Sequence, residues 1–503
     1  MTGTDQMITL APQEFRGQPI PRRMVTAAEW VQAAQDAGAG LFTLLSLWAT
    51  GDAVHMALHS PRTGQIGILS LAVPEGRFPS VGAHHAPAQR LERAIHDLFG
   101  FTPDGAADRR PWLDHGRWGL RHPLGARGPA EAQPPYPFLP VEGESLHQVP
   151  VGPVHAGIIE PGHFRFTAQG ETVVRLEERL GYVHKGLDAL MQGADLARGA
   201  QLAGRTSGDS TVAYAWAFAQ AAESALAAPV PARALFLRAL MAELERLANH
   251  LGDIGAICND AAFAMMLAQC GVLREQVLRA ADTCFGHRFM RDCIVPGGVS
   301  HDLDARGIDA LRDLLAAVRN RFPSIVHLYD NTASLLDRTV ATGRLAPDLA
   351  RRFGAGGPVG RASGRDFDSR RDLPYAPYDT LSFEVPARAE GDVDARIWLR
   401  IREVEQSLAL IDQCLARLPS GPIHAPPAPA DAPREGLALV EAFRGDILIW
   451  LALDAQGRIS RCHMRDASWF QWPLLEAVIE NNIIADFPLC NKSFNCSYSG
   501  HDL

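Results

Sequence analysis

The stretch "PARALFLRALMAELERLANHLGDIGAICNDAAF" occupies residues 231–263, and its leucines decide the fold class of most of the chain. They recur at spacings of three and four, at Leu237, Leu240, Leu244, Leu247 and Leu251. This spacing places them on one face of a helix. Residues 393–418 repeat the pattern at Ile397, Ile401, Val404, Leu408, Ile411 and Leu415. Both segments are predicted to be core helices of a bundle, so the larger, C-terminal part of the chain is expected to be mainly α-helical.

The N-terminal part of the chain has a different pattern. "GLFTLLSLWATGDAVHMAL" at residues 40–58 and "GQIGILSLAV" at residues 64–73 are apolar runs bounded by glycine and polar turns, which is typical of strands. "APAQRLERAIHDLFG" at residues 86–100 has helical spacing. The proline-rich stretch that follows is typical of an extended linker. We therefore expect an α+β domain over residues 1–121, a linker over 122–146 and a large helical domain over 147–503.

Composition excludes several functional classes. The formal charge of −9 argues against a general nucleic-acid-binding protein, which would carry a basic excess. The longest apolar runs, such as "DILIWLALDA", are much shorter than the ~20 residues of a membrane-spanning helix. We expect no transmembrane segment in this chain, so another subunit would have to hold it at a membrane.

The cysteines do not form a cluster-binding pattern. The chain has eight, and no two are spaced C-x-x-C, the pair that commonly presents two thiolates to one metal or iron–sulfur cluster. In a large chain without a recognisable export signal, we expect them to be reduced and buried. The sequence also lacks a G-x-G-x-x-G dinucleotide fingerprint after a strand. We therefore expect no cofactor bound by this chain alone.

Three polar groups stand out against the helical pattern. Glu243, Arg246 and His250 share one side of the first helix and form either a structural ion cluster or part of a site. Asp260 lies among apolar neighbours and must be either hydrogen-bonded or functional, because an unpaired buried carboxylate is costly. Residues 360–380, "GRASGRDFDSRRDLPYAPYDT", form either a solvated turn or the wall of a cavity. Their charged residues are Arg361, Arg365, Asp366, Asp368, Arg370, Arg371, Asp372 and Asp379.

The segment "HQVPVGPVHAGIIEPGHFRF" at residues 147–166 is the strongest candidate for a functional loop. Its polar residues are His155, Glu160, His163 and Arg165, and they crowd into a stretch rich in glycine and proline. A carboxylate beside histidines is a candidate proton donor or acceptor, although loop carboxylates are more often simply solvated.

At these residues the chain resembles a known family. The similarity extends from about residue 147 to the C-terminus and is carried by "VGPVHAGIIEPGHFRF", "RLEERLGYVHKGLDALMQG", "LMAELERLANHLGDIG", "RFMRDCIVPGGVSHDL" and the segment from "RASGRDFDSRR" to "VEQSL". These motifs resemble the large subunit of membrane-bound, energy-converting [NiFe] hydrogenases of the formate-hydrogenlyase and hydrogenase-4 type, and the homologous quinone-site subunit of complex I. Residues 78–123 resemble the small peripheral-arm subunit of complex I that formate-hydrogenlyase large subunits carry as an N-terminal fusion. The resemblance implies the [NiFe]-hydrogenase large-subunit fold.

The resemblance also shows a departure from the family. A [NiFe] site is held by four thiolates, two from R-x-C-G-x-C and two from D-P-C-x-x-C. Here the first element reads "RTSGDS" at residues 205–210, and the second corresponds to "NCSYSG" at residues 495–500. The four ligand positions are thereby occupied by Ser207, Ser210, Ser497 and Gly500. Because nickel and low-valent iron require soft thiolates, no [NiFe] centre is expected.

The remaining family residues imply proton and acceptor chemistry. Glu160 corresponds to the glutamate that starts the hydrogenase proton path, and His155 lies in the loop that carries a quinone-contacting histidine in complex I. Asp260 matches a buried aspartate implicated there in coupling, and Glu243, Arg246 and His250 also fall on matching positions. The tyrosine that grips the quinone headgroup in complex I is missing near Gly208. The candidate catalytic residues are Glu160, Asp260, His155, Arg205, Asp368 and Arg370.

Two functions remain open. In the first, the chain is a subunit of a membrane-associated, complex I-like oxidoreductase that reduces a quinone or another acceptor and couples this step to proton translocation. The expected partners are a small subunit with a [4Fe–4S] cluster and antiporter-like membrane subunits, with the chain on the cytoplasmic face of the inner membrane. In the second, it is a non-catalytic assembly or interaction subunit. Retention of buried charge favours the first function.

Overall fold

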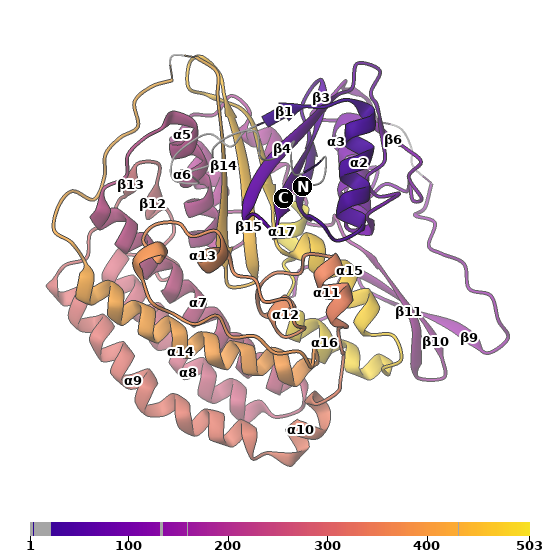
Figure 1. Ribbon diagram of the computed structural model, residues 1–503. Coiled ribbons are helices and arrows are strands. Elements are labelled where there is room, and N and C mark those ends of the chain that lie inside the picture. The colour runs from indigo at the N-terminus through magenta and orange to yellow at the C-terminus, as the bar shows by residue number, and fades with distance from the viewer. Residues whose placement is uncertain (1–3, 5–21, 131–133, 158, 431) are drawn as a thin grey trace.

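The computed structural model describes residue 4 and residues 22–130, 134–157, 159–430 and 432–503 (Figure 1). Most of residues 1–21 of the predicted N-terminal domain, and residues 131–133 of the predicted linker, lie outside the described residues. An α+β region at the N-terminus is followed by a region dominated by long helices. The coarse fold class is therefore as expected, while the boundaries at residues 121 and 146 remain a prediction.

The N-terminal region is a four-stranded sheet in the order β1-β4-β3-β2, with two helices against it. Its elements are β1 (Arg22–Met24), α2 (Ala27–Gly38), β2 (Thr43–Ala49), β3 (Ala53–Ser60), β4 (Gln65–Ala72) and α3 (Gln89–Phe99). Helix α2 begins at a capping box in which Thr26 accepts from the backbone N–H of Glu29 and the Glu29 carboxylate accepts from that of Thr26. The two predicted strand segments and the predicted helix are confirmed.

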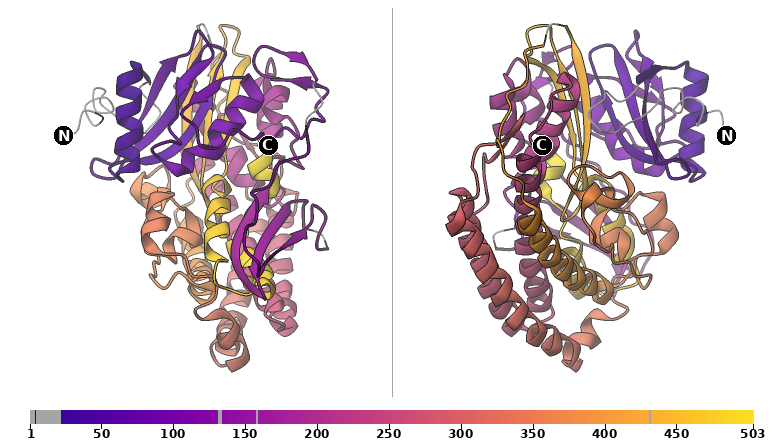
Figure 2. Two further views of the ribbon diagram at one scale, coloured as in Figure 1. Left: turned by 90° about the vertical axis from the view of Figure 1, so that its right-hand side faces the viewer. Right: turned by 60° about the vertical axis from the view of Figure 1, so that its left-hand side comes forward.

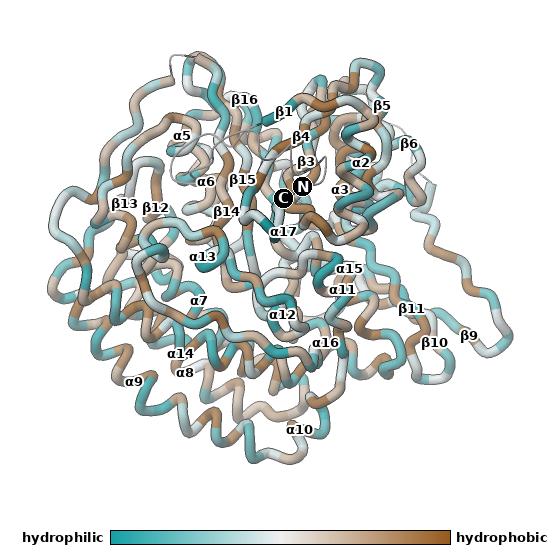
Figure 3. The backbone as a smooth tube through the Cα atoms, in the orientation of Figure 1, coloured by the Kyte–Doolittle hydropathy of each residue, from teal (hydrophilic) through white to brown (hydrophobic). Residues whose placement is uncertain are grey.

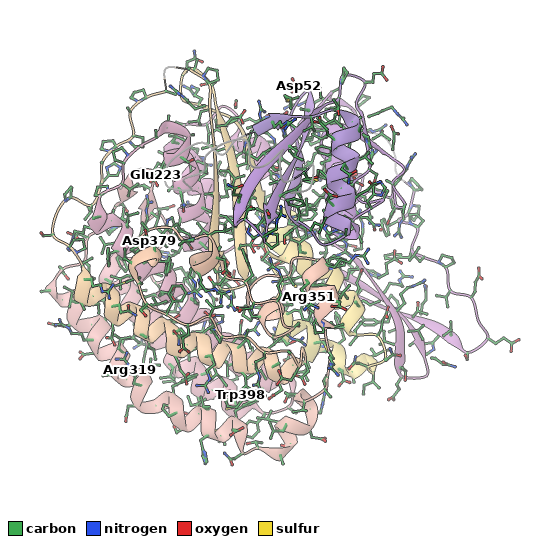
Figure 4. All side chains as sticks on the ribbon, in the orientation of Figure 1. Asp52, Glu223, Arg319, Arg351, Asp379 and Trp398 are labelled. Carbon is green, nitrogen blue, oxygen red and sulfur yellow. The ribbon has the colours of Figure 1, made fainter. Side chains whose placement is uncertain are left out.

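The helical region is built on long helices with apolar faces. These are α6 (Thr211–Leu226), α7 (Ala232–Asp260), α8 (Ala264–Phe285), α9 (Ala305–Asp330) and α14 (Val393–Arg417). The five leucines of α7 are fully buried, which confirms the predicted core face. Figure 3 shows hydrophobic and hydrophilic segments alternating along α9 and α14, as expected where one side of a helix is buried. Glu223 of α6, labelled in Figure 4, pairs at 2.6 Å with Arg238 of α7.

A second sheet crosses this helical region. Its strands are β14 (Arg434–Ala442), β15 (Gly445–Leu453) and β16 (Ile459–Arg465), paired antiparallel in that order. The prediction of a mainly helical large domain did not include this sheet. Strand β15 is almost entirely buried, so it has a continuous apolar run instead of the alternation that marks a half-exposed strand.

The remaining elements are shorter. A three-stranded sheet is formed by β9 (Leu146–Val151), β10 (His163–Gln169) and β11 (Thr172–Arg179). Small ladders are formed by β5 (Arg77–Pro79), β6 (Thr102–Asp104), β7 (Leu120–Arg121), β8 (Gly128–Pro129), β12 (Ile294–Val295) and β13 (Gly298–Val299). The short α-helices are α4 (Leu187–Met191), α5 (Leu196–Ala203), α10 (Ala333–Thr339), α11 (Pro347–Arg352), α12 (Gly357–Arg361), α13 (Ser369–Asp372), α15 (Ser468–Val478), α16 (Phe487–Phe494) and α17 (Tyr498–Asp502).

The N-terminal sheet packs on the β14–β16 sheet through a cluster of aromatic rings. Trp48 of β2 stacks on His463 of β16 at 5.1 Å between ring centroids and lies 5.6 Å from Trp450 of β15. His55 of β3 approaches Trp450 at 5.7 Å, and Ser46 hydrogen-bonds the Nε2 atom of His463 at 2.8 Å. Figure 2 shows the indigo sheet beside the gold strands. These contacts join parts of the chain about 400 residues apart in sequence.

The aromatic cluster predicts acid sensitivity. Burial, with smaller effects of Arg22 and Arg461, lowers the pKa of His55 to about 3, and burial also lowers the pKa of His463 far below 6.5. Between pH 6.5 and about 3, the unfolded chain therefore binds protons that the folded chain does not. Stability is fully present above pH 6.5 and falls as pH decreases, by up to about 1.4 kcal/mol per pH unit for each histidine.

Thermal unfolding measured from pH 7.5 down to pH 5 checks this expectation. His55→Asn should give a shallower decrease of the melting temperature with falling pH than the unsubstituted chain. His301→Asn, at an exposed histidine, serves as the control and should keep the original slope. Equal slopes in the His55 variant and the unsubstituted chain would contradict the prediction.

Candidate functional site

A cavity of about 660 Å³ brings together residues from five separate parts of the chain. Its wall includes the loop after β9, the turn before α6, the last residue of α7, the β14–β15 turn and the segment from α16 to α17. Among the residues singled out in the sequence, it is lined by His155, Glu160, Ser207, Asp260 and Ser497.

Positions of the family's metal ligands meet at this cavity. The Oγ atoms of Ser207 and Ser497 lie 3.3 Å apart, although the two residues are 290 positions apart in sequence. The Oγ atom of Ser497 also accepts the backbone N–H of Gly500 at 2.9 Å, which begins helix α17. Ser210 is buried, and its Oγ atom accepts from Arg444 Nη1 at 3.2 Å. The two segments predicted to carry the ligand positions therefore meet here, with hydroxyl groups facing one another.

An ion pair stands beside these hydroxyl groups. Arg444, in the turn between β14 and β15, donates to both carboxylate oxygens of Asp209, at 2.9 and 2.5 Å. Ser207 Oγ donates to the same carboxylate at 2.7 Å. Burial alone would raise the pKa of Asp209, but Arg444 outweighs it and lowers that pKa to about 2. Asp209 is therefore ionised at neutral pH.

Sequence reasoning missed both members of this pair. Asp209 lies within the quoted "RTSGDS", where a carboxylate between two serines was an available signal. Arg444 gave no such signal, because its partner is 235 positions away and the contact exists only in the folded chain.

The donor set does not fit a [NiFe] centre. Two hydroxyl groups, a glycine without a side chain and a serine bound to a guanidinium stand where four soft thiolates are required. Cys496 lines the cavity, but burial raises the pKa of its thiol far above 9, so it stays protonated. Within the described ranges, no group of three or more His, Cys, Asp and Glu side chains is arranged to hold a metal ion.

Proton-exchanging groups line the same cavity. The Glu160 carboxylate accepts the backbone N–H of Ser499 at 3.0 Å. Burial raises the pKa of Asp260, and the charge of Lys492 partly offsets this effect. Burial, followed by the charge of Lys492, lowers the pKa of His155. Lys492 also lines the cavity and was not singled out in the sequence.

A tyrosine is present in the cavity despite the missing one near Gly208. Tyr498, from the C-terminal ligand loop, places its hydroxyl 3.5 Å from His155 Nε2. The phenol and the imidazole together offer two hydrogen-bonding groups on one side of the cavity. Because the phenol reaches the histidine from another part of the chain, local sequence comparison could not find this pair.

Three predicted residues lie elsewhere. Arg205 is at the surface, where it pairs with Asp292 at 2.7 Å. Asp368 and Arg370 belong to a buried ion cluster and are absent from the described lining of the cavity. We define this buried ion cluster by its members: Glu243, Arg246, Arg361, Asp368, Arg370, Glu403 and Glu441. The 360–380 segment is thus partly buried, while Arg371 forms exposed pairs with Asp366 and Asp372.

The buried ion cluster supports the cavity indirectly. The Arg246 guanidinium donates to the carbonyl oxygens of Glu441 at 2.7 Å and Ala442 at 3.1 Å. These residues end strand β14, and Arg444 follows in the turn. The three residues Glu243, Arg246 and His250 share one face of α7 but do not form one interacting group. Glu243 and Arg246 pair at 3.4 Å, whereas neither ring nitrogen of His250 has a hydrogen-bond partner among the described residues.

Glu245 on α7 positions the "RTSGDS" turn. Its carboxyl group accepts the backbone N–H groups of Val212 at 2.7 Å and Ala213 at 3.1 Å, which would otherwise be unsatisfied at the start of α6. Burial raises the pKa of Glu245 to about 8. The serines just before α6 are thereby held in place from the neighbouring helix.

The Asp209–Arg444 pair yields a prediction about stability. Asp209→Asn would leave the Arg444 guanidinium, 6% exposed, without its counter-charge, whereas Arg444→Gln would leave an aspartate that is 36% exposed. Solvent screens the half-buried aspartate better than the buried guanidinium. We therefore expect Asp209→Asn to lower the free energy of unfolding by about 1–3 kcal/mol, and Arg444→Gln to lower it less.

Chemical denaturation of both single variants and the double variant measures the coupling. The double variant should lose less stability than the sum of the two single variants, because neither charge is then left alone. Asp309→Asn, in an exposed pair on α9, is the control and should change stability by less than about 0.5 kcal/mol. Strict additivity at the Asp209–Arg444 pair would contradict the prediction.

Comparison with known proteins identifies two families along the chain. Residues 21–134 match the family model of the respiratory-chain NADH dehydrogenase 30 Kd subunit, and residues 260–435 match that of the 49 Kd subunit. The described residues contain no helix with the length and apolar character that crossing a membrane requires.

Whole-length relatives agree with these matches. The chain is 32% identical to formate hydrogenlyase subunit 5 of Escherichia coli (strain K12), over 84% of this chain and 77% of that protein. It is 32% identical to the carbon monoxide-induced hydrogenase of Rhodospirillum rubrum, over 70% of this chain and 98% of that protein. An NADH-quinone oxidoreductase subunit of Syntrophobacter fumaroxidans is 30% identical, over 70% of this chain and 95% of that protein.

A solved structure also shares the fold. A chain of the membrane-bound sulfane sulfur reductase, an archaeal respiratory membrane complex, superposes with a TM-score of 0.68 at 25% identity, covering 73% of this chain and all of that one. The chain therefore belongs to the family of formate-hydrogenlyase and hydrogenase-4 type large subunits and their homologues in NADH-quinone oxidoreductases, with the 30 Kd and 49 Kd subunit types fused in one polypeptide.

Proposed function

We propose that this chain is a subunit of a membrane-associated, complex I-like oxidoreductase that works without a [NiFe] centre. In this proposal its cavity binds a quinone or another electron acceptor, and reduction of the acceptor is coupled to proton translocation. One observation carries the proposal. The cavity combines the hydroxyl groups of Ser207 and Ser497 and the Arg444 guanidinium with the carboxylates Glu160 and Asp260.

The lining suits the reduction of a polar, two-electron acceptor. A quinone that becomes a quinol takes up two electrons and two protons, one on each oxygen. Tyr498 and His155 would hydrogen-bond one oxygen, and Glu160 and Asp260 would supply protons. The raised pKa of Asp260 favours this role, because it makes proton uptake by this carboxylate easier.

Electrons must reach the cavity from a partner. We propose a small subunit with a [4Fe–4S] cluster beside the His155 loop and the "RTSGDS" turn, and antiporter-like membrane subunits that complete the complex. The absence of C-x-x-C pairs from the sequence supports an external electron carrier. The chain would then be peripheral, on the cytoplasmic face of the inner membrane, and its domains would divide near residues 121 and 146.

The roles of the other predicted residues follow from their positions. We propose that Asp368 and Arg370 act as positioning residues, because the buried ion cluster braces the strand that leads to Arg444. Arg205, paired with Asp292 at the surface, has no contact that supports a catalytic role, and the proposed chemistry does not require it.

The cavity carboxylates provide the central test. In the purified complex, Glu160→Gln and Asp260→Asn should each lower acceptor-dependent turnover or proton coupling, by roughly 100-fold if proton transfer limits the rate. Assembly should be unaffected, because both substitutions preserve shape. Asp309→Asn, at an exposed pair far along the sequence, is the matched control. Full coupled activity in both cavity variants would instead support a non-catalytic assembly role.

Elemental analysis of the native complex tests the missing metal centre. We expect less than stoichiometric nickel and no hydrogen evolution, because three hydroxyl groups and a glycine replace the soft ligands. Iron and acid-labile sulfide should be present, contributed by the partner subunit. Nickel close to one atom per chain would overturn this part of the proposal.

A further inference from the structure

The buried ion cluster pairs three of its four carboxylates closely with guanidinium groups. Asp368 accepts from Arg370 at 2.7 Å and from Arg361 at 3.0 Å. Glu403 accepts from Arg361 at 2.6 Å and from Arg370 at 3.2 Å. Glu243 accepts from Arg370 at 3.1 Å and from two hydroxyl groups, those of Tyr378 at 2.6 Å and Ser407 at 2.7 Å. Each of these three carboxylates has close donors on both oxygens.

Glu441, the fourth carboxyl group, is held differently. Its Oε2 atom accepts the backbone N–H of Ser369 at 2.9 Å and the Ser369 hydroxyl at 3.0 Å. Within the described part of the chain, its Oε1 atom meets only Arg361 Nη1, at 3.5 Å. The side chain is buried. Arg246 contacts the Glu441 backbone carbonyl and not its carboxyl group.

The charges around Glu441 disfavour ionisation of its carboxyl group. Four charged residues face the Glu441 carboxyl group. Arg370 lies on α13 and Asp368 caps the start of that helix. Arg361 lies on α12 and Asp446 on β15. Asp446 is itself paired with Arg465. Arg365 is nearby but directs its guanidinium to the Ala355 carbonyl oxygen, and the Tyr375 hydroxyl accepts the Glu441 backbone N–H. The buried ion cluster thus sets four carboxyl groups against three guanidinium groups, leaving one carboxyl group without its own close counter-charge.

We propose that Glu441 is a buried proton-binding site that takes up and releases one proton. With the proton bound, the cluster has three carboxylates against three guanidinium groups, and with the proton released it carries one extra negative charge. Burial and then the charge of Asp368 raise the pKa of Glu441 to about 7, which agrees with this geometry. The step transfers a proton only and requires no electron donor.

The proposed proton site lies close in sequence to the turn that lines the cavity. Glu441 lies near the end of β14, and Arg444, whose guanidinium holds Asp209 at the cavity, follows three residues later. Arg246 binds the carbonyl oxygens at the end of this strand, so the proton site and the cavity turn share one rigid support. Proton binding at Glu441 depends on the cluster alone and not on which acceptor, if any, enters the cavity.

The proposal fixes the sign of a stability change. A group whose pKa is raised in the folded state stabilises the fold most at low pH, and this contribution is lost as pH rises from its unfolded value of 4.5 to about 7. Gln mimics the protonated form at every pH. Glu441→Gln should therefore come close to the unsubstituted chain at pH 4 and have a higher melting temperature at pH 8. Glu403→Gln, which removes a closely paired carboxylate, should lower the melting temperature at both values.

Infrared spectroscopy of the assembled complex supplies a second measurement. At pH 6 the difference between unsubstituted and Glu441→Gln protein should contain a protonated-carboxyl C=O band that is lost at pH 8. The difference spectrum for Glu403→Gln should contain a carboxylate band instead. Other buried acids with raised pKa, such as Glu92 and Glu245, cancel in these differences. A lower melting temperature of Glu441→Gln at pH 8, with a carboxylate band at pH 6, would overturn the proposal.

Discussion

Burial of charge around the end of strand β14 is the constraint on which the centre of this structure depends. Arg246 enters from α7 and satisfies the carbonyl oxygens of Glu441 and Ala442. Arg444 lies two residues after Ala442, and its guanidinium donates to the Asp209 carboxylate at the cavity. Buried guanidinium groups are costly unless they are paired and hydrogen-bonded, and these contacts tie the end of the strand to α7 and to the cavity. They thereby support the wall of the cavity.

This support is one of several that hold the cavity wall in place. The Ser207 turn is held by Glu245 at the start of α6, and the Ser497 loop by its own cap on α17. The Glu245 contacts go to backbone N–H groups and use no former ligand side chain, while Ser497 itself caps α17 through its hydroxyl.

The chemistry that remains is that of protons and hydrogen bonds. Glu160 and His155 from one loop, Asp260 from α7 and Tyr498 from α17 face one cavity. The charge of Lys492 acts on Asp260 and His155. Deeper in the protein, the buried ion cluster contains one carboxyl group, that of Glu441, without a close guanidinium partner of its own. Both features are consistent with a family whose members include subunits of respiratory membrane complexes.

The sequence by itself determined the helical and strand segments with strong local patterns, because leucine spacing on α7 and apolar runs in β2–β4 reflect local geometry. It also identified the family, and it predicted that Ser207, Ser210, Ser497 and Gly500 occupy the metal-ligand positions. Only the tertiary structure decided which polar residues share a site. In the folded chain Asp209 contacts Arg444, and His155 contacts Tyr498. Asp368 and Arg370 lie in the buried ion cluster and not at the cavity. These contacts depend on long-range packing, and a side chain's own neighbours in sequence carry no record of the partner it meets on folding.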